Sequence, residues 1–242
     1  MMNMEELTKK IEIIEAKEAI TKIMTHYEVV HTPDLMYRTA DETFALWRDD
    51  CTMEVSDWGV WKGPDAVKYL FEIVMKEDQI GTIMQHHLET PYIEVGSDMQ
   101  TAKATFWSTG FETVFSPDHV PEGMGSCTWS WGKYAADFIK NPETGEWRIW
   151  HLKWFRTLRC NYYRNWVDDE KYMLKGTATG LTGKVKPEHP GLQPMTMHRP
   201  YTSTGLNHPF PLPPQPYDEY DGSFRWWLGD KELQARYDIN VD

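Results

Sequence analysis

Two adjacent histidines, His86 and His87, stand in a run of residues typical of a β-strand. Neighbouring side chains on a strand point to opposite faces, so only one of the two imidazoles can enter a pocket. His86 alternates with the apolar Met84 and Leu88, which favours it as the inward-facing residue. An imidazole titrates near neutral pH and is a natural general acid or base. The pattern predicts His86 as a catalytic residue and keeps His87 as a substrate-binding candidate. A histidine bonded within the sheet is the alternative.

Tyr27 and His31 form a second candidate pair near the end of an N-terminal helix. Residues four apart share a helix face, and this face also carries Ile20 and Ile23. Both polar side chains are therefore predicted to reach a cavity under the helix, where they could bind a substrate or move a proton. In the alternative interpretation, Tyr27 is a core residue with a paired hydroxyl and His31 caps the helix end.

The last long strand carries two further polar candidates on opposite faces. Arg156 alternates with Trp154 and Leu152, whereas His151 alternates with Ile149. Both faces are apolar, so alternation alone leaves open which of them lines the pocket. An arginine there could bind a carboxylate or polarise a carbonyl group. Arg156, Trp154 and His151 are accordingly predicted as substrate-binding residues, with His151 replacing Arg156 if its face is the inner one.

An acidic residue, Asp57, lies beside Trp58 and near Trp61 at the end of an extended segment. A carboxyl group against indole rings could have a raised pKa, so Asp57 and Trp58 are candidate substrate contacts. A solvated turn residue is the alternative. His86, His151 and Asp57 could hold a metal only if the fold brought them together, and the sequence has no HxH or HExxH pattern. No Gly-rich phosphate loop follows a strand, so we expect neither a metal nor a cofactor.

These residues must be positioned by helices followed by a meander of strands. Apolar residues at helical spacing predict a helix over residues 4–31, ending before Pro33. A short helix is expected over 40–48, an extended segment over 51–61 and a third helix after Gly63-Pro64-Asp65. The turn sequence at 141–145 joins two aromatic runs into a hairpin. The order predicts an α+β fold with a curved antiparallel sheet wrapped on N-terminal helices. The expected long strands are Ile83–Val95, Thr101–Ser116, Cys127–Lys140 and Trp147–Leu158.

Composition argues against several classes of function. The 242 residues carry a net charge of −12 and no Lys/Arg-rich run, which argues against a nucleic-acid surface. No apolar stretch approaches the ~20 residues of a membrane-spanning helix, and the charged N-terminus is unlike a secretory signal. We therefore expect a cytoplasmic protein without a membrane partner. Cys51, Cys127 and Cys160 form no CxxC pair, which predicts neither a disulfide framework nor a structural zinc site.

The chain changes character toward its C-terminus, where residues 176–222 are rich in proline and glycine with little periodicity. We expect one domain over residues 1–170 and an extended arm over 171–242, with a short helix within Trp226–Tyr237. Aromatic residues are spread along the arm, which is more typical of a segment that packs on a surface than of a disordered tail. The arm therefore predicts a homo-oligomer, a dimer or trimer, in which arms are exchanged between subunits.

Several short motifs occur in a characteristic order over roughly the first 165 residues. They are Ala19-Ile20 with Tyr27, Phe44–Trp47 with Asp49-Asp50, Gly59–Ala66, Gln85-His86-His87, Thr101–Ala104 and Gly145–Ile149. In this order the chain resembles the nuclear transport factor 2-like superfamily, and within it the SnoaL-like group that includes scytalone dehydratase and bile-acid 7α-dehydratase. The resemblance implies a cone-shaped sheet around a deep pocket, and in many members a dimer or trimer.

The resemblance also implies roles for particular residues. Tyr27 matches a tyrosine of the dehydratases, Gln85-His86 matches the Gln-His of scytalone dehydratase, and Arg156 matches an arginine of the bile-acid dehydratase. Two positions depart from the family. Thr32 stands where an aspartate is expected, which leaves His31 or Asp34 as its substitute. Gly110 stands where relatives carry a polar catalytic residue.

Together these features predict a cofactor-independent lyase or isomerase, with dehydration as the first choice of reaction. The expected substrate is a hydrophobic cyclic, polyketide-like or steroid-like small molecule. His86 would move a proton at a carbon beside a carbonyl, and Tyr27 would hydrogen-bond the developing oxyanion. The alternative is a non-catalytic subunit or small-molecule-binding module, like the small subunit of a ring-hydroxylating dioxygenase. The two differ in whether Tyr27, His31 and His86 line one closed cavity.

Overall fold

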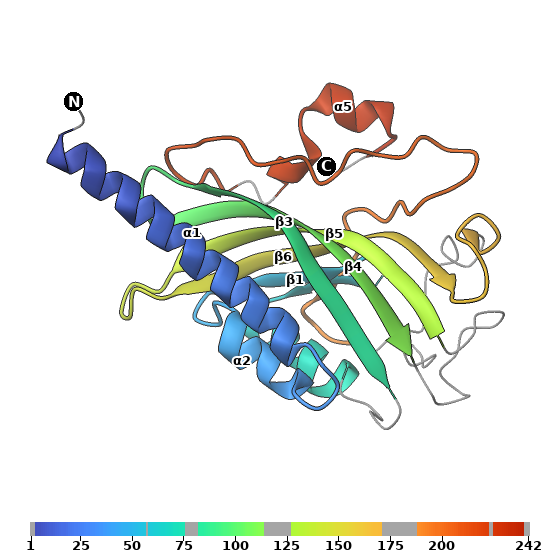
Figure 1. Ribbon diagram of the computed structural model, residues 1–242. Helices are drawn as coiled ribbons and strands as arrows, with labels where there is room; N and C mark the ends of the chain where they lie inside the picture. Colours follow the sequence, from blue (N-terminus) through green and yellow to red (C-terminus); the bar gives the residue numbers. More distant parts are fainter. Residues whose placement is uncertain are drawn as a thin grey trace.

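A computed structural model describes residues 3–56, 58–75, 82–113, 127–170, 188–222 and 225–239. Within these residues, one curled and open sheet has seven strands in the order β3-β4-β5-β6-β1-β2-β7, with helices packed against it (Figure 1). The predicted α+β fold with a curved sheet is confirmed. The strands are β1 (Thr52–Val55), β2 (Gly59–Lys62), β3 (Ile83–Val95), β4 (Thr101–Thr113), β5 (Cys127–Lys140), β6 (Trp147–Asn161) and β7 (Leu192–Gln193).

The long strands β3 to β6 form an antiparallel meander. At the turn between β5 and β6, the Asn141 side chain accepts a hydrogen bond from the Glu143 backbone N–H at 2.8 Å. The Gly145 N–H donates to the Asn141 carbonyl, also at 2.8 Å. Gly145 has a φ of 72°, a conformation that glycine adopts without a steric penalty. The turn chemistry therefore closes the predicted hairpin.

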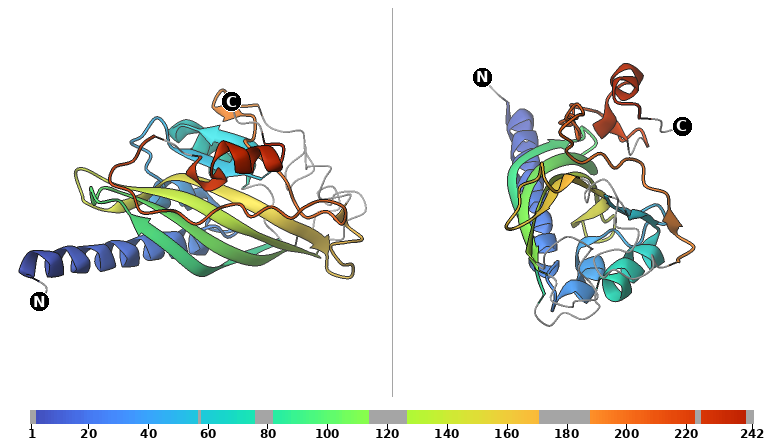
Figure 2. Two further views of the ribbon diagram at one scale, coloured as in Figure 1. Left: turned by 90° about the horizontal axis from the view of Figure 1, so that it is seen from above. Right: turned by 90° about the vertical axis from the view of Figure 1, so that its right-hand side faces the viewer.

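Helix α1 (Met4–Val30) begins at a capping box, in which Asn3 and Glu6 each bond the other's backbone N–H. Its first half is exposed and extends past the sheet, whereas its second half packs on the sheet (Figures 1 and 2). The helix ends at His31, before Pro33, as predicted. The residues that the helix buries are Ala16, Ile20, Ile23, Met24, Tyr27 and Val30.

Two local predictions between α1 and β3 are wrong. The helix expected over 40–48 is shorter, because Phe44 turns extended and bridges to Ile149 of β6. The segment expected to run extended over 51–61 is instead a tight hairpin, in which β1 pairs with β2 and also lies parallel to β6. The third helix forms where proline predicts it. The elements here are η1 (Met36–Arg38), α2 (Thr39–Thr43), α3 (Pro64–Tyr69) and the π-helical turn η2 (Leu70–Val74).

The described part of the C-terminal arm begins at the edge of the sheet, where β7 pairs with β2, and later residues of the arm pack on the face of the sheet opposite α1 (Figure 2). Phe210, Trp227 and Leu228 are buried there against Phe155 of β6. The expected terminal helix is divided into η4 (Trp226–Leu228) and α5 (Lys231–Arg236), because the chain turns at Gly229 with a φ of 70°. Within the single chain the arm covers its own sheet. Exchange of arms between subunits stays a prediction, as does the boundary at residue 170, beyond which residues 171–187 are not described.

Candidate active site

A buried cavity of about 30 Å³ lies between the helices and the inner face of the sheet. It brings together six of the residues predicted from sequence, and aliphatic and aromatic side chains form the rest of its wall. The lining residues are Tyr27, His31, Met53, Val55, Trp58, Met75, Met84, His86, Glu112, Tyr134, Trp154 and Arg156.

Tyr27 and His31 enter the cavity from the last turn of α1. Their rings stack with centroids 5.0 Å apart, as the spacing of four residues allows. His31 is also the C-cap, but it caps through its backbone N–H, which donates to the Tyr27 carbonyl at 2.8 Å. The Tyr27 hydroxyl is buried, and it interacts with the hydroxyl of Tyr134. Both side chains are thus placed on the cavity wall.

The environment of α1 sets the protonation states of this pair. Burial, with the nearby His86 adding to it, lowers the pKa of His31 to about 3. His31 is therefore neutral at physiological pH and is suited to hydrogen bonding rather than to donating a proton as an imidazolium. Burial, together with the charge of Glu28, raises the pKa of the Tyr27 phenol well above its ordinary value, so it stays protonated.

His86 enters from β3, on the inner face that it shares with Met84. Its side chain is only 6% exposed, and Nε2 lies 3.4 Å from Glu112 Oε1. The ring meets Trp154 edge to face at a centroid distance of 5.3 Å. Its other nitrogen, Nδ1, is buried without a hydrogen-bond partner among the described residues. His86 therefore has one nitrogen close to a carboxylate and the other facing Gly110 of β4.

Sequence reasoning missed an ionic cluster behind His86. Glu112 of β4 lies with Oε2 2.7 Å from Arg159 Nη2, and both side chains are buried. Burial opposes ionisation of Glu112, but the positive charges of Arg159 and Arg156 and the hydrogen bond from His86 outweigh it and hold the pKa of this carboxyl well below its usual range. Glu112 alternates with Gly110 along β4, so strand periodicity could have placed it inside. Only the pairing of β4, β5 and β6 brings Arg159 to it.

Tyr134 and Glu28 were also missed. Tyr134 of β5 lies edge-on to Tyr27 at 6.1 Å and tilted against Trp154 at 4.8 Å. Glu28 follows Tyr27 on α1 and is only partly exposed, with Oε1 buried. Burial raises the pKa of Glu28 to about 7, although His86 acts in the opposite direction. Glu28 could therefore exchange a proton near neutral pH close to the cavity.

Of the other predicted residues, His87 and His151 are not part of this cavity. His87 is exposed on the outer face and contacts Gln85 at 3.1 Å. Asp57 lies outside the described residues. His151 faces the arm and bonds Asp137 at 2.9 Å. His86 and His151 are thus on opposite faces of the sheet, and they cannot share a metal ion.

The faces of β6 differ from simple alternation because of a β-bulge. Asp137 pairs with His151 and Phe138 pairs with Ile149, which leaves Trp150 as an extra residue. Trp150 therefore joins His151 on the arm side, where the two rings stack at 4.5 Å. Leu152, Trp154 and Arg156 lie on the inner side. Trp154 and Arg156 line the cavity and His151 faces the arm, which resolves the choice that the sequence left open.

Comparisons with known proteins agree with this architecture. Residues 12–153 match the SnoaL-like domain family model, which is more than half of the chain. A provisionally named scytalone dehydratase from Novosphingobium aromaticivorans aligns at 17% identity and a TM-score of 0.51, covering 64% of this chain and 93% of that one. A hexachlorocyclohexane dehydrochlorinase (LinA) aligns at 14% identity and a TM-score of 0.49, covering 62% of this chain and 90% of that one. At these identities the structures share the fold alone. A search of the curated proteins gave no match.

In the described part of the chain, no helix is both long and apolar enough to cross a membrane.

Proposed function

Because this chain belongs to the SnoaL-like domain family, we propose that it is a lyase or isomerase that works by proton transfer without a cofactor. One observation carries the proposal. Tyr27 and His86 line the same cavity, both side chains are buried, and His86 Nδ1 has no hydrogen-bond partner among the described residues. Buried polar groups are normally paired, and orphaned ones in a cavity are suited to a ligand.

The proposed step is dehydration of a hydroxylated cyclic ketone. His86 removes a proton from the carbon beside the carbonyl, and the protonated Tyr27 phenol donates a hydrogen bond to the oxygen that becomes negative. The carbon–oxygen bond at the next carbon then breaks and a double bond forms. The leaving hydroxide takes the proton from His86, so water is released and the imidazole is restored. Glu112 lies 3.4 Å from His86, and its negative charge stabilises the imidazolium that forms after His86 takes the proton.

The surrounding residues suit a flat, largely apolar substrate. Trp58, Trp154 and Tyr134 supply aromatic walls, and Arg156 supplies a positive charge that could hold a second oxygen of the substrate. His31, neutral at physiological pH, would serve as a hydrogen-bonding contact. The substrate class we propose is therefore a hydrophobic cyclic, polyketide-like or steroid-like ketone.

The test follows proton exchange as well as product. The protein is incubated in D₂O with a panel of hydroxylated cyclic ketones, and NMR records deuterium at the carbon beside the carbonyl while absorbance records the enone. We expect both signals with the parent protein, and a loss of at least about 100-fold in His86→Gln, the size typical of a general base. His87→Gln is the matched control, since His87 lies on the outer face, and it should keep full activity. Equal activity of both variants would contradict the proposal.

A non-catalytic binding module remains the second candidate, because the cavity has about 30 Å³, room for about one water molecule. A substrate would have to displace side chains to enter. If ketones of the panel bind without any deuterium exchange in the parent protein, this second function is favoured.

A further inference from the structure

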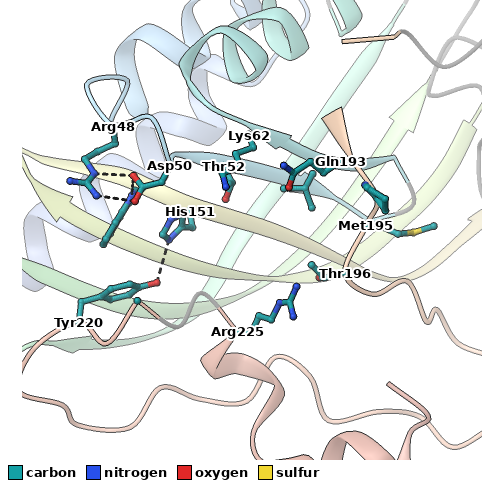
Figure 3. A pocket seen from close by; sticks show the side chains of 14 residues that line it. Arg48, Asp50, Thr52, Lys62, His151, Gln193, Met195, Thr196, Tyr220 and Arg225 are labelled. Atoms are coloured by element: carbon teal, nitrogen blue, oxygen red, sulfur yellow. Dashed lines mark hydrogen bonds and ion pairs between the residues drawn. The ribbon is translucent and has the colours of Figure 1, made fainter. Parts of the chain in front are cut away.

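A second and larger pocket of about 770 Å³ lies on the opposite face of the sheet, between β1, β2, β6 and the C-terminal arm (Figure 3). Its volume falls within the range of small-molecule sites, which is about 300–1,000 Å³. His151, the histidine that the inner cavity does not use, forms part of its wall. The proposed dehydratase chemistry assigns no role to this pocket.

The pocket wall is positively charged in a chain whose net charge is −12. Arg48, Lys62 and Arg225 reach it from three separate segments, and Asp50 is the only acidic residue among the described residues that line it. Arg48 holds Asp50 by two hydrogen bonds, of 2.9 and 2.8 Å. With His151 neutral, the lining carries a formal charge of +2. Such a concentration of positive charge attracts anions.

Thr52 supplies an independent sign of a ligand. It lies on β1 beside His151 and is 95% buried, with 5% of its surface exposed. Its hydroxyl has no hydrogen-bond partner among the described residues, although it lines the pocket between Lys62 and His151 (Figure 3). Leaving a buried hydroxyl unpaired is unfavourable, and a ligand or water bound there would satisfy it.

His151 is held rigidly at the base of the same pocket. Its Nδ1 bonds the buried Asp137 at 2.9 Å. Asp137 also accepts hydrogen bonds from the Tyr220 hydroxyl at 2.9 Å and from the Trp226 indole N–H at 2.7 Å. Two of these partners come from the arm, so the arm fixes the orientation of the ring. A site fixed in this way is prepared before any ligand arrives.

We propose that this pocket binds a small organic carboxylate. The carboxylate group would accept hydrogen bonds from the Thr52 hydroxyl and from Arg225, whose planar guanidinium matches it. The apolar Val60 and Met195, also on the wall, would contact the carbon skeleton. An organic carboxylate fits better than inorganic phosphate, because phosphate has no apolar part to contact Val60 and Met195.

The test is isothermal titration of the full-length protein with sodium benzoate at constant ionic strength. Benzamide is the uncharged analogue, and inorganic phosphate is the competing anion. We expect saturable binding of benzoate at one site, with affinity at least about tenfold lower in Thr52→Val and in Arg225→Gln, as loss of a hydrogen bond to a charged group implies. Arg236→Gln, an exposed arginine of α5 outside the pocket, is the matched control and should bind as the parent does.

Three results would overturn the proposal. The first is no saturable heat with benzoate at millimolar concentration. The second is tighter binding of phosphate or benzamide than of benzoate. The third is loss of binding in His86→Gln with full binding in Arg225→Gln, which would assign the carboxylate to the inner cavity. A protein that fails the ketone assay but binds benzoate through Thr52 and Arg225 would support this site and reject only the proposed dehydration.

Discussion

His86 and Gly110 lie directly opposite each other on β3 and β4, and the glycine provides the space that the imidazole occupies. A Cβ at position 110 would lie 2.6 Å from His86 Nδ1 and 2.6 Å from the Gln85 carbonyl oxygen. The departure of Gly110 from the family pattern therefore has a steric reason. His86 of β3 fits because Gly110, its partner on β4, has no side chain.

Gly110→Ala should lower the free energy of unfolding by about 1–3 kcal/mol, the cost of overpacking a buried site. The contact with a backbone oxygen means that rotation of His86 alone does not relieve the clash. Urea denaturation measures the change. Thr109→Ala, on the outer face of the same strand, is the control and should change stability by less than about 1 kcal/mol. An alanine tolerated as well as the control would disprove the steric interpretation.

Glu112→Gln should destabilise the protein by about 3–5 kcal/mol, because it removes the negative charge that lies 2.7 Å from the buried guanidinium of Arg159. The side-chain volume is almost unchanged, so the effect reports the lost charge rather than packing. Glu89→Gln removes an exposed carboxylate from β3 and should be close to neutral. Thermal and urea unfolding at pH 7 distinguish the two, and equal stability of both variants would count against the ion pair.

The pH dependence of stability should reveal Glu28. Its pKa is raised from 4.5 to about 7, so the folded protein keeps a proton that the unfolded chain releases, and this contribution to stability decreases as pH rises through that interval. His31 acts in the opposite direction. Its pKa is lowered from 6.5 to about 3, so stability is lost as pH falls from 6.5.

The two effects oppose each other between pH 4.5 and pH 6.5. In Glu28→Gln only the His31 effect remains, so the free energy of unfolding should increase more steeply with pH than in the parent protein. Denaturation curves at pH 4.5, 5.5 and 6.5 measure the slopes. Glu18→Gln, exposed on α1, should leave the slope unchanged. Parallel curves for Glu28→Gln and the parent would refute the shifted pKa of Glu28.

A buried ion pair on the arm side gives another test. Lys153 and Glu54 are fully buried together, and Lys153 Nζ also donates to Thr196 Oγ1 at 2.8 Å and to the Met197 carbonyl at 3.1 Å. Lys153→Met should cost about 3–5 kcal/mol because it leaves the Glu54 carboxylate buried without its partner. Adding Glu54→Gln removes that charge but keeps an acceptor for the Thr196 N–H. The double variant should therefore be more stable than Lys153→Met alone, and a double variant that is less stable would contradict this account.

The arm also predicts an oligomer. Sedimentation equilibrium of the full-length protein should give a mass of two or three chains, because an arm that covers its own sheet can cover a neighbour's in the same way. A monomer at every concentration would reject arm exchange.

The strands and α1 could be predicted because their patterns are local. Alternation over Ile83–Val95 and Cys127–Lys140 gives the bounds of β3 and β5 as the structure has them, and the apolar positions of α1 predict its buried face. The segment 44–48 was predicted incorrectly because Phe44 pairs with Ile149, a residue about a hundred positions away. No local pattern contains that contact.

The candidate site shows the same division. The periodicity of β3 placed His86 inside, and helical spacing paired Tyr27 with His31. Which face of β6 is the inner one depended on the packing of α1 against Leu152 and Trp154, which alternation cannot reveal. The pairing of Glu112 with Arg159 requires β4, β5 and β6 in register, so it arises only in the folded sheet.

The strand β6 separates two compartments, and residues 151–156 are all buried. No position in this stretch is left to solvent, so every substitution here alters one compartment or the other. Because the residues alternate, a substitution on one side leaves the side chains of the other side unchanged. The inner compartment is lined by Leu152, Trp154 and Arg156. The outer one, on the arm side, is lined by His151, Lys153 and Phe155.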